Sequence, residues 1–420
     1  MADNDVIAAL PEDVLLQVLS RVADVKSLFM LAATCRRWLR RFTDRAFLRD
    51  LWGGQRAGDL LVFFFHRQRN SASTFGFLPA PPLRPLIPSS YDGEPLTARR
   101  GILLMRLSPS NDWSEATSHL LGLLNPITGE HHVLPHLKGP SNLGSFAVTS
   151  CAIIFSDDLA GKQPQPPSSG RFMFSQLLVT TKHKSIKTVH LHSYSATRSS
   201  WAAPAVFLDL RRFSLVGEGS SSSAVVHRGA AHWLCTDHVA RATRDDYLYK
   251  LSVEVGGTAT ATPRVSMTKL PVLDGGTPTP LLCVGGDGEL TIVCVFIMHV
   301  RVWKQQRRGD GDGDGAAAWR RDVIWMPTEV SNYPKSYTMA HGLGRRGSVA
   351  MMYSSTGAVF VLDLDKKVME KAMDCLLPLR MDHSLDRPPV PYEMDLVEFF
   401  LLQLGGLCSR GDLQDNQLIN

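Results

Sequence analysis

The segment from Leu10 to Trp52 most constrains what this chain can fold into, because its apolar residues recur at helical spacing over a short stretch. Leu10-Pro11 followed by two acidic residues has the form of a helix start. We expect a first helix from Asp13 to Val22 and a second from Val25 to Ala33. The third has the clearest periodicity, at i, i+3, i+4 and i+7, formed by Cys35, Trp38, Leu39 and Phe42. Such a small bundle is near the lower size limit for independent folding, so we expect it to be stabilised by contacts with something outside itself.

The first helix has more apolar surface than two short neighbouring helices would cover. At 100° per residue its apolar side chains span an arc of about 140°, and Leu16 widens it further. The arc is formed by Val14, Leu15, Val18, Leu19 and Val22. Downstream, Asp44 is expected to open a fourth short turn in which Phe47, Leu48 and Leu51 are apolar. The first helix therefore has a surface left for a partner, either a second protein or the rest of this chain.

Three stretches of this segment together indicate a family. They read LPEDVLLQVLSRV, KSLFMLAATCRRWLRRF and DRAFLR, and they resemble the F-box, specifically that of plant F-box proteins whose remaining chain is an F-box-associated, propeller-like region. One departure is visible: many members have a proline after the first helix, where this chain has Val22-Ala23-Asp24-Val25. The departure concerns the angle between the first two helices.

The resemblance implies a substrate receptor of an SCF ubiquitin ligase, in which the F-box binds a Skp-type adaptor held by a cullin scaffold. Carried over residue by residue, it predicts adaptor contacts at Leu10, Pro11, Leu15, Leu16, Val18 and Leu19. It predicts that Cys35, Trp38, Leu39 and Phe42 hold the bundle together. The alternative is that the first helix packs on the downstream domain.

The chain beyond Trp52 has the pattern of an all-β domain. Residues 60–65 read as a buried strand, residues 66–100 as an extended connection rich in arginine, serine and proline, and from Gly101 short apolar runs alternate with turn residues. Many short strands over so long a stretch favour a β-propeller over a sandwich or barrel. Asn-Pro-x-Thr-Gly-Glu at 125–130 and His232-Trp233-Leu234 also resemble the F-box-associated region. The predicted fold class is multidomain: a small all-α bundle followed by a large all-β domain.

The predicted domain boundaries follow from these patterns. They are a disordered lead at 1–9, the F-box at 10–52, a connecting segment with the first strand at 53–100, a β-propeller-like domain at 101–380, a C-terminal helix and return segment at 381–408, and a polar tail at 409–420. Within the fifth of these, the apolar spacing from Glu393 to Leu404 predicts the helix.

Composition narrows the class of protein further. The formal net charge is only +5, which argues against a nucleic-acid partner, and no apolar run is long enough to span a membrane. Seven scattered cysteines show no disulfide framework, and the first residues do not resemble a signal peptide. We expect a soluble protein of the cytoplasm or nucleus.

The motifs of catalysis and metal binding are either missing or incomplete. Asp310–Gly315 matches half of an EF-hand loop, but Arg321 stands where the loop needs a bidentate glutamate. Residues 342–347 match GxGxxG but lead into a strand rather than a helix. The histidine pairs at 131–132 and at 190 and 192 have no neighbouring cysteine or carboxylate. We therefore predict no catalytic residue, cofactor or metal.

Two other functions stay open at this point. One is a propeller-type ligand-binding protein or enzyme, and the other is an F-box scaffold that acts outside a ligase. The target of a receptor is not readable from the loops. If one loop dominates recognition, those with Trp201 or Trp303 are the candidates, although blade core is the favoured position for both rings.

Overall fold

A computed structural model describes most of the β domain and a few residues of the N-terminal segment. Two units separate, one formed by Met1–Leu61 with Glu393–Asn420 and the other by Val62–Tyr392. The described residues are 14, 17, 41–42, 44, 46–48, 60–69, 72–78, 92–108, 118–125, 130–139, 145–159, 174–183, 187–216, 224–237, 248–254, 263–270, 279–296, 298–305, 319–327, 338–343, 347–353, 358–374 and 390–394.

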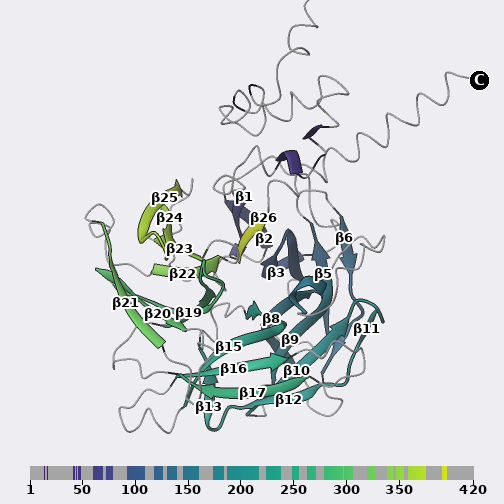
Figure 1. Cartoon of the computed structure of the whole chain (residues 1–420). Coiled ribbons are helices and arrows are strands. Elements are labelled where there is room, and N and C mark those ends of the chain that lie inside the picture. Colours follow the sequence, from purple (N-terminus) through teal and green to yellow (C-terminus); the bar gives the residue numbers. More distant parts are fainter. Residues whose placement is uncertain are drawn as a thin grey trace, which may run out of the picture. The chain divides into compact units, whose positions relative to one another are not determined.

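The second unit is a β-propeller of five antiparallel blades that follow one another along the chain (Figure 1). Blade 1 comprises β3 (Asp92–Arg99), β4 (Ile102–Ser108), β5 (Ser118–Leu124), β6 (His131–Val133) and β7 (Leu137–Lys138). Blade 2 comprises β8 (Phe146–Phe155), β9 (Phe174–His183), β10 (Thr188–Ser195), β11 (Ser200–Trp201) and β12 (Ala205–Asp209), with a 3-10 helix at Ser156–Asp158 after β8.

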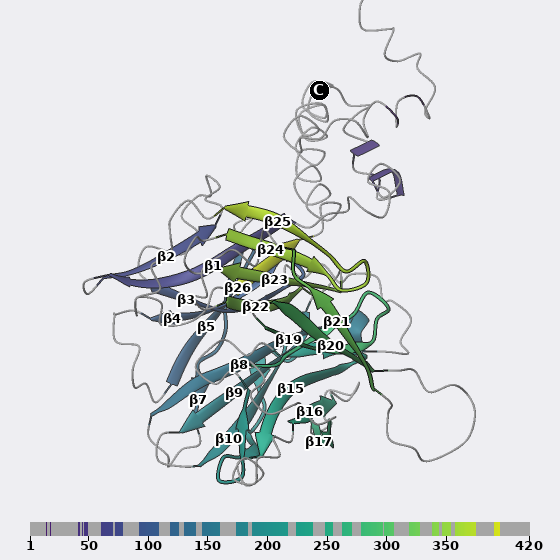
Figure 2. The ribbon, with the colours of Figure 1, turned by 90° about the vertical axis from the view of Figure 1, so that its left-hand side faces the viewer.

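The other three blades repeat this plan. Blade 3 comprises β13 (Phe213–Leu215), β14 (Val225–His227), β15 (Ala230–Asp237), β16 (Leu248–Glu254) and β17 (Arg264–Lys269). Blade 4 comprises β18 (Leu281–Val284), β19 (Leu290–Val295), β20 (His299–Gln305) and β21 (Trp319–Trp325). Blade 5 comprises β22 (Thr338–Leu343), β23 (Ser348–Tyr353), β24 (Ala358–Asp363) and β25 (Val368–Asp374), which lie in that order across the sheet (Figure 2).

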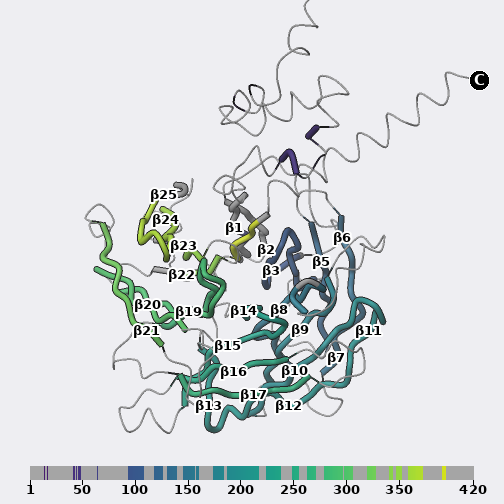
Figure 3. Tube along the Cα trace, viewed as in Figure 1, coloured from purple at the N-terminus to yellow at the C-terminus, as the bar shows by residue number. Residues whose placement is uncertain are grey.

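A three-stranded sheet brings the two ends of the β domain together. Its strands are β1 (Leu60–Arg69), β2 (Ala72–Leu78) and β26 (Val390–Met394), in the order β2-β1-β26. In Figure 1 the late β26 therefore lies beside the early β1. Figure 3 traces the backbone of the five blades in the same view. Tyr392 in β26 is buried, stands edge-on to Phe64 at 5.5 Å, and donates a hydrogen bond from its hydroxyl to the Gly101 carbonyl at 3.1 Å. A late strand is thus fastened to both β1 and blade 1.

The core lies between consecutive blades. Strands at one edge of each blade adjoin their counterparts in the next blade, with β3 beside β8, β8 beside β14, β14 beside β18, and β18 beside β22. One apolar cluster fills each junction, so a blade buries side chains on both faces. Strands that are buried on both sides read as continuous apolar runs, and such runs were the sequence signal for β4, β5, β8 and β19.

The predicted fold class is confirmed, since the described part of the chain is nearly all β and forms a propeller. Two local expectations differ from the structure. Residues 66–100, expected as an extended connection, contain the end of β1 and all of β2 and β3. Glu393 and Met394, expected at the start of a helix, belong to strand β26, and the rest of that expected helix lies outside the described residues. Val349–Tyr353 and Ala358–Leu364 form the expected hairpin as β23 and β24.

The GxGxxG spacing at 342–347 has a packing explanation. A Cβ on Gly342 would lie 2.8 Å from the Cys283 Cβ, and one on Gly347 would lie 2.7 Å from the Gly286 Cα. Gly347 also has a φ of +58°, which favours glycine. Gly342 and Gly347 thus allow the β22–β23 hairpin of blade 5 to approach the β18–β19 hairpin of blade 4.

Ion pairs link neighbouring blades beyond the apolar clusters. Blade 1 joins blade 2 through Arg99, whose Nη1 and Nη2 donate to the Asp158 carboxylate at 2.5 and 2.8 Å. Further pairs are Arg228–Glu289 between blades 3 and 4, and Lys304–Asp365 and Lys367–Asp322 between blades 4 and 5. Asp158 also accepts from the Phe155 N–H at 2.8 Å, so both of its carboxylate oxygens accept hydrogen bonds.

We expect Asp158→Asn to lower the free energy of unfolding by about 1–3 kcal/mol, because a bidentate charged pair is lost in a partly screened position. Burial acts to raise the Asp158 pKa, but the hydrogen bonds and charge of Arg99, with Phe155 and Arg100, outweigh it and lower the pKa below 3.8. A carboxyl whose pKa is lowered in the folded state stabilises the fold at pH values above its ordinary, unfolded-state pKa. That stabilisation is lost as the pH falls through the folded-state pKa.

Urea unfolding of both proteins at neutral pH and at stepwise lower pH measures this effect. The difference between wild type and Asp158→Asn should shrink as the carboxyl becomes protonated. A difference that stays constant down to the lowest pH would contradict the assignment. The surface substitution Asp209→Asn, in an exposed turn of blade 2, is the matched control and should show neither effect.

Candidate functional site

The described part of the N-terminal segment is a capped turn with buried aromatic side chains. Asp44 accepts from the Ala46 N–H at 2.9 Å through Oδ1, and its carbonyl accepts from the Leu48 N–H at 3.1 Å. This is how an aspartate caps a helix start. Phe42 and Leu48 are fully buried, and the Phe42 ring stands edge-on to Phe47 at 5.7 Å. Asp44 thus opens the short turn as expected, and Phe42 lies in a local apolar core.

The remaining residues predicted for this module lie outside the described residues. They are the expected adaptor contacts Leu10, Pro11, Leu15, Leu16, Val18 and Leu19, and the expected core residues Cys35, Trp38 and Leu39. Two neighbours on the expected first helix, Val14 and Gln17, are helical and exposed. The adaptor contacts therefore stay a prediction.

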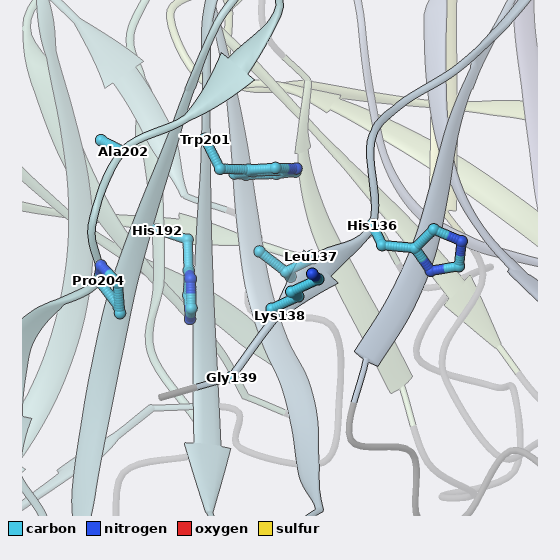
Figure 4. A pocket seen from close by; sticks show the side chains of 8 residues that line it. All are labelled: His136, Leu137, Lys138, Gly139, His192, Trp201, Ala202 and Pro204. Atoms are coloured by element: carbon cyan, nitrogen blue, oxygen red, sulfur yellow. The ribbon is translucent and has the colours of Figure 1, made fainter. Parts of the chain in front are cut away.

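The propeller has a pocket of about 450 Å³ at the junction of blades 1 and 2. Its lining comes from the segment around β7 and from β10, β11 and the chain that follows. The eight lining residues are His136, Leu137, Lys138, Gly139, His192, Trp201, Ala202 and Pro204. In Figure 4 the ring of Trp201, seen edge-on, lies above His192, Leu137 and Lys138, with His136 farther away.

Trp201 is held in place from two sides. Its Nε1–H donates to the Pro135 carbonyl at 2.8 Å, and its ring packs on Tyr194 at 5.2 Å. The first contact ties blade 2 to the end of blade 1, and the second joins the ring to the core of that junction. A fixed, half-buried indole ring is a suitable platform for a flat or apolar group.

A histidine cluster surrounds Phe146, and one of its members, His192, also lines the pocket. The ring of His119 stands edge-on to Phe146 at 4.7 Å, and its Nε2–H donates to the Phe146 carbonyl at 2.7 Å. His183 and His192 pack on the same ring at 5.5 and 6.3 Å. His192 Nε2 lies 2.9 Å from the Thr181 hydroxyl. The residues come from β5, β8, β9 and β10, so this cluster exists only in the folded propeller.

The charge of the pocket comes from one residue. Burial, followed by the nearby His190 and His183, lowers the His192 pKa to about 4, so this imidazole is neutral at physiological pH. None of the eight lining residues is acidic, and Lys138 carries the permanent charge. The pocket is suited to holding an anionic or amide group beside an indole, and it has no acid–base pair for catalysis.

The described cysteines and histidines do not form a reactive thiol site or a metal site. Burial raises the pKa of the Cys235, Cys283 and Cys294 thiols to about 12, which removes them as nucleophiles. Within the described ranges no three histidine, cysteine or acidic side chains come together as a metal site. His131 and His132 lie exposed on β6, while His190 and His192 lie on β10.

The tryptophans divide between core and surface. Trp303 is 5% exposed and belongs to the cluster between blades 3 and 4, so it is the blade-core residue that was favoured. Trp201 lines the pocket, as a recognition residue would. Sequence reasoning missed Trp325, which is 72% exposed at the end of β21.

Trp233 of the His-Trp-Leu motif is buried and donates to the Ser150 hydroxyl at 2.8 Å, which ties blade 3 to blade 2.

The N-terminal segment and the β domain each resemble known proteins. The β domain is a propeller, and residues 7–51 match the family model described as F-box-like. The chain therefore combines a segment that is similar to an F-box with a propeller. A search of curated proteins found no significant match. No helix among the residues described in the structure is long and apolar enough to cross a membrane.

Solved structures resemble the chain only distantly. A calcium-binding regucalcin from Agrobacterium tumefaciens is 15% identical with a TM-score of 0.35, covering 66% of this chain and 73% of its own. A prolyl endopeptidase is 14% identical with a TM-score of 0.32, covering 84% and 55%. An oligogalacturonate lyase from Vibrio parahaemolyticus is 10% identical with a TM-score of 0.31, covering 77% and 88%. At these values the likenesses support no functional conclusion.

Proposed function

We propose that this protein is the substrate-receptor subunit of an SCF-type ubiquitin ligase, of the kind found in plant F-box proteins. The observation that carries the proposal is an F-box-like segment at residues 7–51 joined to a propeller. The F-box binds a Skp-type adaptor and, through it, a cullin scaffold. The propeller binds a target protein. Such a receptor works in the cytoplasm or the nucleus.

The physical role of such a receptor is to raise the effective concentration of the target protein near the activated ubiquitin. A target held on the propeller stays near the activated ubiquitin, which turns a bimolecular encounter into a local one. No acid, base or nucleophile is required of the receptor for this. The neutral His192, the inert buried thiols and the rigid Trp201 of the described propeller suit binding rather than bond-breaking chemistry. The receptor is accordingly proposed to be non-catalytic.

One experiment on the full chain tests both adaptor binding and target binding, with negative charges introduced into the F-box. Wild type and Leu15→Asp/Leu19→Asp are each purified from cells under conditions that preserve ubiquitin conjugates. We expect adaptor and cullin only with wild type, and the same target proteins with both, ubiquitinated only with wild type. Recovery of target conjugates with the variant, or adaptor with neither protein, would contradict the proposal.

A second candidate function, small-ligand binding, is favoured by the pocket at Trp201. Its volume, its fixed indole and the single lysine would suit an anionic metabolite. Native mass spectrometry of the purified full chain tests it. A stoichiometric small molecule that is lost on Trp201→Ala would favour this function over target binding at the same place.

A further inference from the structure

The pocket at Trp201 continues along the outer edge of blade 2. Trp201 pairs with Tyr194 of β10, and Val206 pairs with His190, four residues earlier on that strand. Paired residues share a face of a sheet, and so do residues four apart on one strand. Trp201 packs on the cluster between blades 1 and 2, so Val206 also lies on the side of blade 1. We define the Trp201–Val206 surface as Trp201, Pro204 and Val206 with Leu137 and Lys138 of β7.

A bulge in β12 gives Val206 this orientation. The register of β12 shifts where it pairs with β10, and the next two residues, Phe207 and Leu208, both pack in the cluster between blades 2 and 3. Bulges re-aim side chains in this way. Val206 lies on the other face and is 66% exposed. It therefore adds apolar surface beside the pocket that the eight lining residues do not include.

Both walls of the pocket are fixed by contacts within the propeller. On the side of blade 2, the Trp201 indole is held by the hydrogen bond from its Nε1–H to the Pro135 carbonyl at 2.8 Å. On the side of blade 1, a Cβ on Gly139 would lie 2.7 Å from Cδ1 of Phe146, so the chain after β7 packs against that ring because glycine has no Cβ. Fixed walls lose little conformational entropy when a partner binds. The surface is therefore pre-organised.

Lys138 gives the surface one permanent positive charge. None of the eight residues that line the pocket is acidic, and the buried His192 is neutral. Within the part of the chain that the structure describes, Lys138 is exposed and forms no ion pair. In Figure 4 its side chain lies beside Leu137, below the ring of Trp201. A carboxylate of a bound group can therefore approach this ammonium without displacing an existing ion pair.

The length of the surface favours an extended chain over a compact ligand. The β10 partners of Trp201 and Val206 are four residues apart, which places the two side chains about 13 Å from each other. An extended peptide spans about 13 Å with four residues. A single ring compound that rests on Trp201 would leave Val206 uncovered. The exposed valine therefore points to a partner that continues beyond the pocket.

We propose that the Trp201–Val206 surface binds an extended segment of a protein partner, with two apolar side chains four residues apart and a carboxylate beside the first. The first apolar side chain packs on Trp201, the second packs on Val206, and the carboxylate lies at Lys138. Tryptophan is among the residues that most often dominate protein interfaces, and an opposite charge fixes the register of the segment. The inference rests on the proposed function in one respect, that the partner is the target of the receptor.

Selection from a library of random ten-residue peptides displayed on phage, with the full chain as bait, tests this inference. We expect the enriched peptides to share two apolar residues four apart and an acidic residue next to one of them. Fluorescence anisotropy with a labelled enriched peptide then measures the affinity. Trp201→Ala and Val206→Asp should each weaken binding by about tenfold or more. Lys138→Gln should weaken it and make the affinity insensitive to replacement of the peptide's acid by its amide.

Val206→Asp keeps the test valid if Trp201→Ala disturbs the fold, because Val206 is exposed on an edge strand. Two positions outside the surface supply matched controls. Val265→Asp changes an exposed valine on β17 of blade 3, and Lys366→Gln removes an exposed lysine in a turn of blade 5. Both should bind the peptide as wild type does.

Three results would each overturn the inference. The first is the absence of the expected pattern among the enriched peptides. The second is unchanged peptide binding by a folded Val206→Asp variant. The third is a stoichiometric small molecule that native mass spectrometry finds in wild type and Val206→Asp but not in Trp201→Ala, since the pocket alone would then hold a compact ligand.

Adaptor binding measured on the same samples separates this inference from the proposed function. Val206→Asp should retain the Skp-type adaptor while losing the peptide. If wild type binds the peptide through Trp201 and Val206 but no adaptor, the ligase role fails and the Trp201–Val206 surface stands. If wild type binds the adaptor but no peptide of the expected pattern, the Trp201–Val206 surface fails and the ligase role stands.

Discussion

Tyr392→Ala is expected to lower the free energy of unfolding by about 3–5 kcal/mol, the largest effect of any single substitution considered for the propeller. Tyr392 is 1% exposed, so its removal leaves a cavity against Phe64 and strips β26 of its main side-chain anchor. It also leaves the Gly101 carbonyl without the 3.1 Å hydrogen bond from the hydroxyl. Urea unfolding of the full chain, followed by circular dichroism, measures the loss.

Tyr392→Phe is the matched control for this prediction. It keeps the ring and the packing on Phe64 but removes the hydroxyl, so a cost of about 1–2 kcal/mol is expected. The two variants together separate packing from hydrogen bonding. Equal stability of wild type and Tyr392→Ala would contradict the view that β26 fastens the end of the β domain to blade 1.

Leu15→Asp/Leu19→Asp is expected to abolish adaptor binding by the full chain. Burying two carboxylates in an apolar interface costs several kcal/mol of binding free energy. A loss of about 4 kcal/mol is enough to weaken a complex a thousandfold. Calorimetric titration with a Skp-type adaptor measures the affinity. Gln17→Asp is the matched control, because Gln17 is helical, exposed and about 200° from Leu15 around the helix. It should bind as wild type does.

The large features of the fold could be predicted because they depend on local patterns. Short apolar runs separated by turn residues indicated the blades, since a strand buried on both faces must be apolar throughout. The spacing around Phe42 and the cap at Asp44 indicated helical turns for the same local reason. The F-box-like segment was predicted at 10–52 and is matched at 7–51.

Other elements depend on partners that are distant in the sequence. Strand β3 contains Pro95, which usually argues against a strand, and the structure accommodates it at a register shift between Pro95 and Thr97. Strand β26 is short, contains Pro391, and becomes a strand only through pairing with β1. No local pattern in 66–100 or 390–394 carries this information.

The candidate sites could not be predicted for the same reason, because their residues are distant from one another in the sequence. His119, Phe146, His183 and His192 belong to one cluster, but up to 73 positions separate them in the sequence. Trp303 and Trp325 both follow apolar strand residues, yet one is in the core and the other is exposed. Both rings lie on the same face of blade 4, but Trp303 is on the inner strand β20 and Trp325 is at the end of the edge strand β21, and the sequence of a single strand does not encode that difference.

The most direct test of the central claim is whether the full chain and a Skp-type adaptor elute together on size-exclusion chromatography after co-expression. The account predicts a stoichiometric complex with wild type, retained by Gln17→Asp and lost by Leu15→Asp/Leu19→Asp while circular dichroism shows the β domain still folded. A folded wild-type protein that elutes without adaptor would contradict the receptor function.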